Sequence, residues 1–575
     1  MKRYWKYIRP YIQYYILGPC FMMMEVVGDV LLPYMLAKII NQGIAERNVV
    51  YIIKIGVIMG FIAVIMAVGG VLGAWFASKA AMNFGADLRM DLFEKIQQFS
   101  FQNIDNFSTG SLITRLTNDI TQIQNMIMMT LRMCLRSPGI LIGAMVMAFV
   151  ISPKLAAIFI IVLPVLAVLI VVIMRRAFPQ FRTLQEKLDA LNSCIQEGLV
   201  GIRLIKSFVR GDYEEMRFEK RNQQLKEANL TAMKTMLLYT PLMTLALNIT
   251  TVVVVWSGGY LIVAGNMQVG DLTAFTNYIV QIMSSLTMLS IAFLNWARAI
   301  ASFRRVGEVL NEKIDLTDEN AKHKDRAVCE GSVEFQNVSF RYYKNSPEWV
   351  IENISFKLEA GKTLGIIGPT GSGKSTLVSM IPRLYDTDEG TVLVDGINVR
   401  DYGLKPLREG IGMVLQNNTL FSGSITENLK WGDEHADEKA VRKAAQNAQA
   451  AGFIDSFKDG YRTRLEQSGN NVSGGQKQRL CIARALLKCP KILILDDSTS
   501  AVDTATERAI REALHSEYKD MTKIIIAQRI RSVMDADEIL VLDNGKTAGF
   551  GTHEQLLADC PVYREIYDVQ NGREE

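Results

Sequence analysis

Six long apolar runs in the first half of the chain limit its fold more strongly than any other feature of the sequence. A helix needs about 20 mostly apolar residues to cross the hydrocarbon core of a bilayer, and each run is close to that length. We therefore predict an all-α transmembrane domain of six helices within residues 1–313. The runs cover residues 14–36, 51–76, 134–151, 155–174, 237–262 and 273–296.

The two longest connections between these runs are polar but keep a helical pattern, as in FGADLRMDLFEKIQQF. This pattern indicates that transmembrane helices continue well beyond the bilayer. Residues 175–234 contain twelve Lys and Arg, whereas residues 263–271 contain none. Since basic residues concentrate in cytoplasmic loops, we expect both long connections, both termini and the C-terminal half in the cytoplasm. The chain would then be a multi-pass protein of the cell membrane.

Polar side chains occur inside the first and last of the predicted spans. Glu25 and Asp29 are four residues apart and therefore share one helix face, and Asn277 and Gln281 do the same. Carboxylates at membrane depth normally face a bundle interior or a wet cavity, so all four residues are candidates for a substrate cavity that attracts cations. The alternatives are a structural pair with a partner on another helix and polar contacts that hold helices together.

A polar, charged segment at 314–330 predicts a linker, and alternating strand patterns follow it in residues 331–575. One apolar strand leads directly into GPTGSGKST, which matches the phosphate-binding P-loop pattern between a strand and a helix. Its glycines let backbone N–H groups surround phosphates, and the helix N-terminus adds its dipole. We expect an α/β P-loop nucleotide-binding domain that binds ATP through these residues: Gly368, Pro369, Thr370, Gly371, Ser372, Gly373, Lys374, Ser375 and Thr376.

An acid at the end of the strand KILILD completes the predicted site. In P-loop proteins such an acid holds Mg²⁺, so Asp496 and Ser375 are the expected ligands of this cofactor. A second glycine-rich cradle opens the helix that starts near Ser473. One chain does not need two cradles for one ATP, whereas a dimer does if each ATP lies between Lys374 of one chain and Ser473 of the other.

The combination of this P-loop, SGGQ and DDSTSAVD resembles the nucleotide-binding domain of ABC transporters, and the six preceding spans resemble an ABC exporter half-transporter. The resemblance implies that Tyr342 stacks on adenine, that Gln416 senses Mg²⁺ and water, and that segments 103–112 and 206–215 are coupling helices. It also implies that four signature residues and one further aspartate contact the ATP of a partner chain. These residues are Ser473, Gly474, Gly475, Gln476 and Asp503.

Two positions depart from the family pattern. Asp497 stands where the family has the catalytic Glu, and Gln528 stands where it has a His. The shorter carboxylate misplaces the attacking water, and the neutral amide cannot carry a proton. Together they indicate tight ATP binding with slow hydrolysis. The pattern resembles the degenerate-site subunit of heterodimeric bacterial multidrug exporters, with a partner half-transporter that supplies the consensus Glu and His.

These inferences predict an ATP hydrolase coupled to transport, which exports hydrophobic or amphipathic compounds of drug or lipid type. The expected partners are the second half-transporter, membrane lipid and a small amphipathic substrate. The small net charge of +4 says nothing about nucleic acid, but six spans on the same chain exclude a soluble ATPase that acts on ribosomes or DNA, so we expect no nucleic-acid partner. Two alternatives remain open. One is a homodimeric lipid or peptide flippase, and the other is a nucleotide-sensing regulatory subunit.

Overall fold

The computed structural model describes the chain except for residues 1, 345, 498–501 and 572–575, and the described chain divides into two units. The membrane unit contains residues 1–97 and 110–311, and the nucleotide unit contains residues 98–109 and 312–575. The segment 98–109 is therefore part of the nucleotide unit although it lies between two helices of the membrane unit. The domain boundaries 1–313, 314–330 and 331–575 remain predictions.

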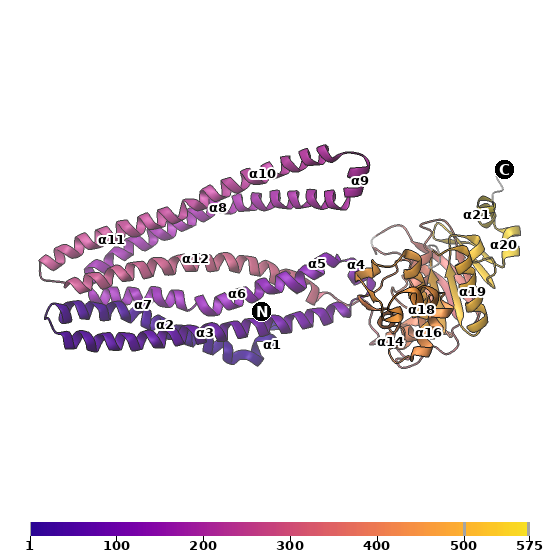
Figure 1. Ribbon diagram of the computed structural model, residues 1–575, viewed down its shortest axis with the longest axis horizontal. Coiled ribbons are helices and arrows are strands. Elements are labelled where there is room, and N and C mark those ends of the chain that lie inside the picture. The colour runs from indigo at the N-terminus through magenta and orange to yellow at the C-terminus, as the bar shows by residue number, and fades with distance from the viewer. Residues whose placement is uncertain (1, 345, 498–501, 572–575) are drawn as a thin grey trace. The chain divides into compact units, whose positions relative to one another are not determined.

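The membrane unit is entirely helical over its described residues (Figure 1). Its helices are α1 (Trp5–Ile8), α2 (Ile12–Lys38), α3 (Val49–Gln97), α5 (Thr109–Thr114), α6 (Ile120–Met133), α7 (Arg136–Ile151), α8 (Pro153–Val200), α9 (Ile202–Ser207), α10 (Gly211–Leu237), α11 (Tyr239–Val263) and α12 (Val269–Asn311). The π-helical segments Ile39–Ile44 and Arg115–Asp119 continue α2 and α5.

The long helices agree with the prediction that the spans extend beyond the bilayer. Helix α3 has 49 residues and α8 has 48, so at 1.5 Å per residue each is about 70 Å long, more than twice the thickness of a hydrocarbon core. Between α7 and α8 only Ser152 is left outside a helix, and its hydroxyl accepts a hydrogen bond from the Leu155 backbone N–H. Pro153 occupies the first position of α8, where its missing N–H costs nothing.

Five of the six predicted spans are confirmed by length and apolar composition among the described residues. They lie in the helical segments Trp5–Ile44, Val49–Gln97, Thr109–Ile151, Pro153–Val200 and Gly211–Val263. The sixth, residues 273–296, falls within the continuous helix α12, parts of which lie outside the described side chains, and remains a prediction.

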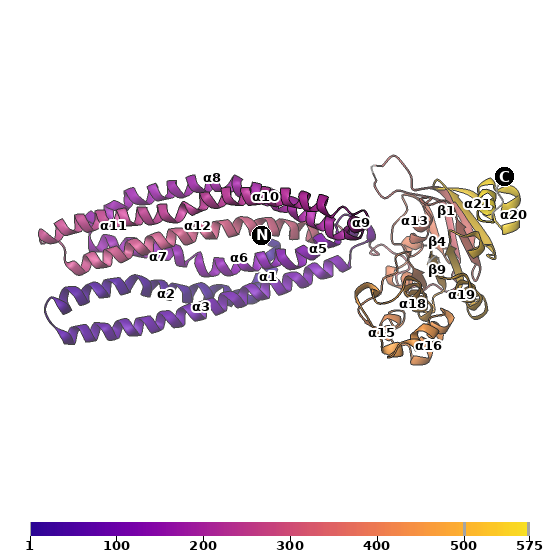
Figure 2. The ribbon, with the colours of Figure 1, turned by 45° about the horizontal axis from the view of Figure 1, so that its top comes forward.

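Helices far apart in the sequence share one core in the membrane unit. Helix α8 runs beside α10 and α11 in both views (Figures 1 and 2), while α12 packs against α2, α6 and α7. Phe159 of α8 stacks on Phe275 of α12 with ring centroids 5.4 Å apart, and both rings are fully buried. The Tyr278 hydroxyl donates to the Val30 carbonyl oxygen at 2.8 Å, which joins α12 to α2.

The nucleotide unit contains two main sheets. The first is antiparallel, in the order β2-β1-β4-β5, and the second has the order β12-β11-β3-β10-β9-β6, with only β12 antiparallel to its neighbour. The strands are β1 (Val333–Phe340), β2 (Ile351–Leu358), β3 (Thr363–Ile367), β4 (Glu389–Val394), β5 (Ile397–Asn398), β6 (Ile411–Val414), β9 (Ile492–Asp496), β10 (Thr522–Ile526), β11 (Glu538–Asp543) and β12 (Lys546–Gly551). A small hairpin pairs β7 (Gly423–Ser424) with β8 (Arg464–Leu465).

Helices cover these sheets. They are α4 (Phe101–Asp105), α13 (Lys374–Ser379), α14 (Leu404–Glu409), α15 (Ile425–Leu429), α16 (Glu438–Asn447), α17 (Ala451–Ser456), α18 (Gly474–Leu487), α19 (Thr504–Glu517), α20 (His553–Asp559) and α21 (Pro561–Asn571). Strands β9 and β10 are buried along their whole length. Their continuous apolar sequence is typical of parallel strands covered on both faces, so the predicted α/β domain is confirmed.

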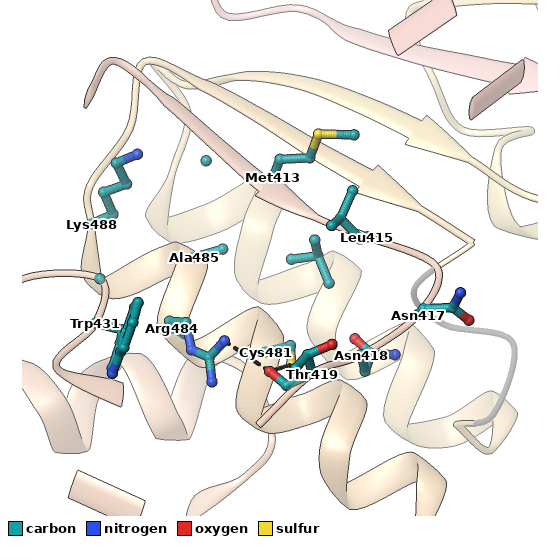
Figure 3. A pocket seen from close by; sticks show the side chains of 13 residues that line it. Met413, Leu415, Asn417, Asn418, Thr419, Trp431, Cys481, Arg484, Ala485 and Lys488 are labelled. Carbon is teal, nitrogen blue, oxygen red and sulfur yellow. Dashed lines mark hydrogen bonds between the residues drawn. The ribbon is translucent and has the colours of Figure 1, made fainter. Parts of the chain in front are cut away.

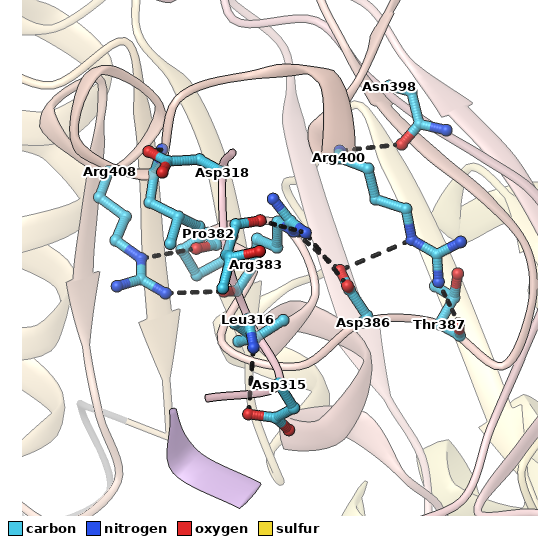
Figure 4. A network of polar contacts seen from close by, with 12 residues as sticks. Asp315, Leu316, Asp318, Pro382, Arg383, Asp386, Thr387, Asn398, Arg400 and Arg408 are labelled. Atoms are coloured by element: carbon cyan, nitrogen blue, oxygen red, sulfur yellow. Dashed lines mark hydrogen bonds and ion pairs between the residues drawn. The ribbon is translucent and has the colours of Figure 1, made fainter. Parts of the chain in front are cut away.

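The segment that joins the two units is tied to the nucleotide unit by polar contacts (Figure 4). Arg383 is buried, forms an ion pair with Asp386 at 2.8 Å, and donates to the Thr317 carbonyl oxygen at 3.3 Å. The Asp318 carboxylate accepts a hydrogen bond from the Leu404 backbone N–H at 3.3 Å. Although this segment lacks helices and strands, its start is therefore held in a defined position on the nucleotide unit.

Candidate functional site

The predicted catalytic and nucleotide-binding residues meet at one edge of the parallel sheet. The P-loop follows β3, Gln416 follows β6, Asp496 ends β9, and Gln528 lies two residues after β10. Carboxyl ends of parallel strands meet at the same edge, which is where ligands bind in open α/β sheets. These side chains line one pocket of ≈ 210 Å³, together with Val350 and Ile526, which the sequence did not single out.

The P-loop backbone requires glycine at several positions, two of which line the phosphate pocket. Gly371 and Gly373 have φ angles of 87° and 89°, in the left-handed region that glycine adopts without steric cost. A Cβ atom on Gly373 would also lie 2.7 Å from Ile351 Cγ2 and 2.9 Å from the Val350 carbonyl oxygen. The loop can therefore form only with glycine here, and it brings main-chain groups close to any bound phosphate.

Lys374 and Ser375 begin helix α13 at the end of this loop. The Lys374 ammonium donates to the carbonyl oxygens of Gly368 and Pro369 at 2.9 and 2.7 Å, so it is held over the loop. The Ser375 hydroxyl donates to Asp496 Oδ1 at 2.9 Å. A hydroxyl beside a buried carboxylate is a hard oxygen donor set, which fits the ligand preference of Mg²⁺. These two residues would hold the ion.

Removal from water changes the acidity of the charged groups in the pocket. Burial raises the pKa of the Asp496 and Asp497 carboxyls and lowers the pKa of the Lys374 ammonium. The Ser375 hydrogen bond opposes the shift at Asp496, and the Gln528 hydrogen bond opposes the shift at Asp497. The pocket thus contains two carboxyl groups and one ammonium in a site of low polarity, where electrostatic interactions with phosphate are strong.

The two residues that depart from the family pattern contact each other directly. The Gln528 amide Nε2 donates to Asp497 Oδ2 at 2.8 Å, and the Gln416 side chain also hydrogen-bonds to this carboxylate. Asp497 is 8% exposed and has a φ angle of 45°. Among non-glycine residues Asp and Asn adopt this left-handed region most readily, so the backbone here suits Asp.

Tyr342 lies just beyond β1 and is not among the residues that line the pocket. Its hydroxyl is 2.9 Å from Thr376 Oγ1, and its ring packs edge-on against Tyr385 with centroids 5.3 Å apart. The tyrosine is therefore next to the P-loop helix, and its adenine-stacking role remains a prediction.

Tyr385 also contacts the first predicted coupling segment. Its hydroxyl donates to Asp105 Oδ2 at 3.0 Å, and its ring lies 5.9 Å from that of Phe101. Both residues belong to α4, which is joined by three-residue connections to α3 and α5 of the membrane unit. Helix α4 thus belongs to the nucleotide unit, while the chain on both sides of it continues into helices of the membrane unit.

The signature residues and Asp503 cap helices. The Ser473 hydroxyl accepts from the Gln476 backbone N–H, and the Gln476 side chain accepts from the Ser473 N–H at 2.9 Å, which forms a complete capping box at the start of α18. Asp503 accepts from the Thr506 N–H at 2.9 Å at the start of α19. Residues 498–501 lie outside the described residues. The action of these groups on a partner's ATP remains a prediction.

The polar residues of the first span have a partner that the sequence did not single out. Arg136, at the start of α7, forms ion pairs with Glu25 at 2.8 Å and with Asp29 at 3.3 Å. The Gln281 amide donates to the Asp29 carbonyl oxygen at 2.7 Å, whereas Asn277 donates within its own helix. A basic residue at the start of the apolar run 134–151 could have indicated this partner for the two carboxylates. The substrate cavity remains a prediction.

A second pocket of the nucleotide unit, of ≈ 240 Å³, lies between the chain after β6 and helix α18 (Figure 3). Trp431 is 65% exposed at its rim and stacks on Phe421 at 4.2 Å. Arg484 and Lys488 make the lining basic, and Arg484 donates to the Thr419 carbonyl oxygen at 3.1 Å. This pocket is separate from the phosphate site, but it adjoins the segment that begins with Gln416.

The fold and the site together define a membrane protein with an ATP-binding P-loop domain, and comparisons with known proteins name its family. The family "ABC transporter transmembrane region" matches residues 15–286, and the family "ABC transporter" matches residues 351–500. The "Uncharacterized ABC transporter ATP-binding protein YfiB" of Bacillus subtilis (strain 168) is 39% identical over 574 residues, covering 100% of this chain and 99% of the relative. The chain therefore belongs to the ABC transporter family.

Two further comparisons refine this result. A B. subtilis relative with the name "Putative multidrug export ATP-binding/permease protein YgaD" is 33% identical, over 99% of each chain. The solved "Structure of a bacterial Atm1-family ABC exporter with ATP bound" covers 98% of both chains with a TM-score of 0.81 at 24% sequence identity, so the chain has the same fold. In this family ATP hydrolysis is coupled to transport.

Proposed function

We propose that this chain is one half of a heterodimeric exporter of hydrophobic or amphipathic compounds, and that its own ATP site mainly binds ATP. The observation that carries the proposal is the pairing of Asp497 with Gln528 inside a pocket whose P-loop, Lys374, Ser375 and Asp496 are intact. The groups that would hold the phosphates and Mg²⁺ all line this pocket. The two groups that act on the attacking water are the two that depart from the family pattern.

The chemistry of the site supports slow hydrolysis. Asp497 is one methylene shorter than Glu, and a misplacement of about 1 Å can cost on the order of a hundredfold in rate. Its carboxylate already accepts from the Gln528 amide, which cannot take up a proton. Mg²⁺, when bound by Ser375 and Asp496, would neutralise charge on the phosphates. The chain's own residues would then orient ATP without an efficient base for water.

The capped signature helix supports a partner with a competent site. The intact Ser473–Gln476 capping box presents the start of α18 as an anion cradle. In a dimer this cradle would complete the ATP site of the partner, which would supply the consensus Glu and His. The chain would therefore serve hydrolysis in the partner's site while its own site stays closed on ATP.

Two contact surfaces would transmit the motion of the nucleotide domains. Helix α4 contacts Tyr385 of its own nucleotide unit. The tip formed by residues 199–213 exposes Leu204, Phe208 and Tyr213 by 61%, 69% and 56%. Its charged residues are Arg203, Lys206, Arg210 and Asp212. The exposed apolar side chains of this tip would suit a groove on the second subunit like the one with Trp431 at its rim (Figure 3). We place the nucleotide domain and both termini in the cytoplasm.

Two observations support the proposed class of substrate. The name of the relative YgaD includes multidrug export. In the membrane unit, Glu25, Asp29 and Arg136 form an ion-pair cluster with one more negative than positive charge. A cluster of this kind within spanning helices favours amphipathic compounds that carry positive charge.

Removal of the carboxylate from each of the two ATP sites in turn tests the asymmetry. Asp497→Asn should lower substrate-stimulated ATP turnover of the purified complex by less than about threefold, because this site contributes little to hydrolysis. Removal of the partner's corresponding carboxylate should eliminate most of the turnover. The measurement is steady-state phosphate release from the reconstituted complex. Equal losses from the two changes would contradict the asymmetry, because both sites would then contribute equally to hydrolysis.

A further inference from the structure

A residue of the C-terminal helix holds the loop that carries Gln528. The Gln570 side chain, in α21, donates from Nε2 to the Gln528 carbonyl oxygen at 2.7 Å, and its Oε1 accepts from the Ile530 N–H at 2.8 Å. Both bonds have ordinary lengths. One amide thus bonds to the main chain on both sides of Arg529, as a neighbouring strand would. We refer to residues 527–530 as the switch loop.

Buried contacts fix the position of helix α21, which carries Gln570. Tyr563 is fully buried, and its hydroxyl lies 2.7 Å from His553 Nδ1 of α20. Ile566 of α21 packs against the same apolar cluster that contains the buried residues Ile530 and Val533. Because the helix and the chain after the switch loop share one core, the Gln570 side chain reaches the loop from a fixed position.

The opposite end of Gln528 faces the phosphate pocket. Its side-chain amide lines the pocket and donates to Asp497 at 2.8 Å, while its carbonyl oxygen is held by Gln570. The direction of the side chain is therefore set by two contacts, one inside the pocket and one outside it. Loss of the outer contact would remove one of these two constraints on residue 528.

We propose that Gln570 is a positioning residue, which acts through the switch-loop backbone to aim the Gln528 amide at the terminal phosphate of ATP. The inference rests on the proposed ATP site of this chain and adds a role for the C-terminal helix. ADP lacks the γ-phosphate, so Gln570 should affect the binding of ATP but not the binding of ADP. A purely structural residue would weaken both.

Competition for photolabelling measures this difference on the chain itself. The full-length complex is labelled with 8-azido-[α-32P]ATP in the presence of AMP-PNP or ADP as competitor. This chain is then recovered after denaturation through an affinity tag, and its label is measured. Gln570→Ala should lower the affinity for AMP-PNP about three- to tenfold, the effect of one or two lost hydrogen bonds. The affinity for ADP should stay unchanged. Gln570→Glu keeps an acceptor for Ile530 but has no donor for Gln528, so it should lose a similar amount.

A matched variant and a double variant separate positioning from stability. Val569→Ala changes the neighbouring residue of the same helix, whose side chain is 76% exposed, and should alter neither affinity. In a Gln528→Ala background, Gln570→Ala should cause no further loss for AMP-PNP, because the group that it positions is gone. An equal loss for both nucleotides, a further loss in that background, or no loss at all would each overturn the proposal.

A failure of the Gln570 proposal can be distinguished from a failure of the proposed function. The label is read on this chain whether its partner is a different subunit or a second copy, so a homodimer would overturn the heterodimer but leave the Gln570 result meaningful. Failure of the wild-type chain to take the label would overturn both the ATP site and the role of Gln570.

Discussion

Replacement of Asp497 by Glu together with Gln528 by His is expected to raise hydrolysis at this chain's site about a hundredfold. The longer carboxylate would reach the position of the attacking water, and a misplacement of about 1 Å accounts for a change of this size. The imidazole can donate to the terminal phosphate and can also carry charge. The rate is measured as phosphate release from a complex whose partner lacks its catalytic carboxylate, so that only this site contributes.

The single variants are the internal controls for this restoration. Because Asp497 and Gln528 contact each other, their effects should not be additive, and each single change should recover less than the double change. Asp497 has a φ angle of 45°, which Glu adopts less readily, so the melting temperature of each variant is compared with that of the wild type. A well-folded double variant with unchanged hydrolysis would show that other features of the site limit the rate.

Lys374→Ala should lower ATP binding to this chain by about ten- to hundredfold. Its ammonium is held over the P-loop by the Gly368 and Pro369 carbonyl oxygens, in position to meet phosphate. Charge-assisted hydrogen bonds contribute about 1.5–3 kcal/mol each, which corresponds to this range. The loss is measured by photolabelling of the separated chain with 8-azido-[α-32P]ATP.

Lys405→Ala is the matched control for that experiment. Lys405 is a lysine of the same nucleotide unit, with a side chain 86% exposed and an ion pair to Glu409 at 3.8 Å. Exposed pairs of this kind contribute little, so its removal should leave ATP binding unchanged. Undiminished labelling of the Lys374→Ala chain would contradict the assignment of the pocket as the ATP site.

The class of fold could be predicted because both halves of the chain follow strong local rules. Runs such as 51–76 and 155–174 can only be buried in lipid, and Pro153 after Ser152 marks a tight connection. The sequence gives no local signal that residues 98–109 belong to the nucleotide unit. That membership depends on contacts such as the one between Asp105 and Tyr385, which are 280 residues apart.

The phosphate site could also be predicted from the sequence, because its residues lie in motifs that end or follow strands. The structure brings the side chains predicted from these motifs to one pocket, and their action on ATP stays a prediction: Lys374, Ser375, Gln416, Asp496 and Gln528. Gln570 and Arg136 could not be placed from the sequence, because each acts across a tertiary contact. Gln570 is an ordinary surface residue by pattern, and its function is apparent only from the two hydrogen bonds to the switch loop.

Native mass spectrometry of the complex, isolated from its own host through a tag on this chain, tests the heterodimer most directly. The account predicts two different subunits of similar mass, one of which is this chain of 64.4 kDa. The partner should carry Glu and His at the positions that correspond to Asp497 and Gln528. A complex that contains only copies of this chain would contradict the account, because ATP would then be hydrolysed with Asp497 and Gln528 alone.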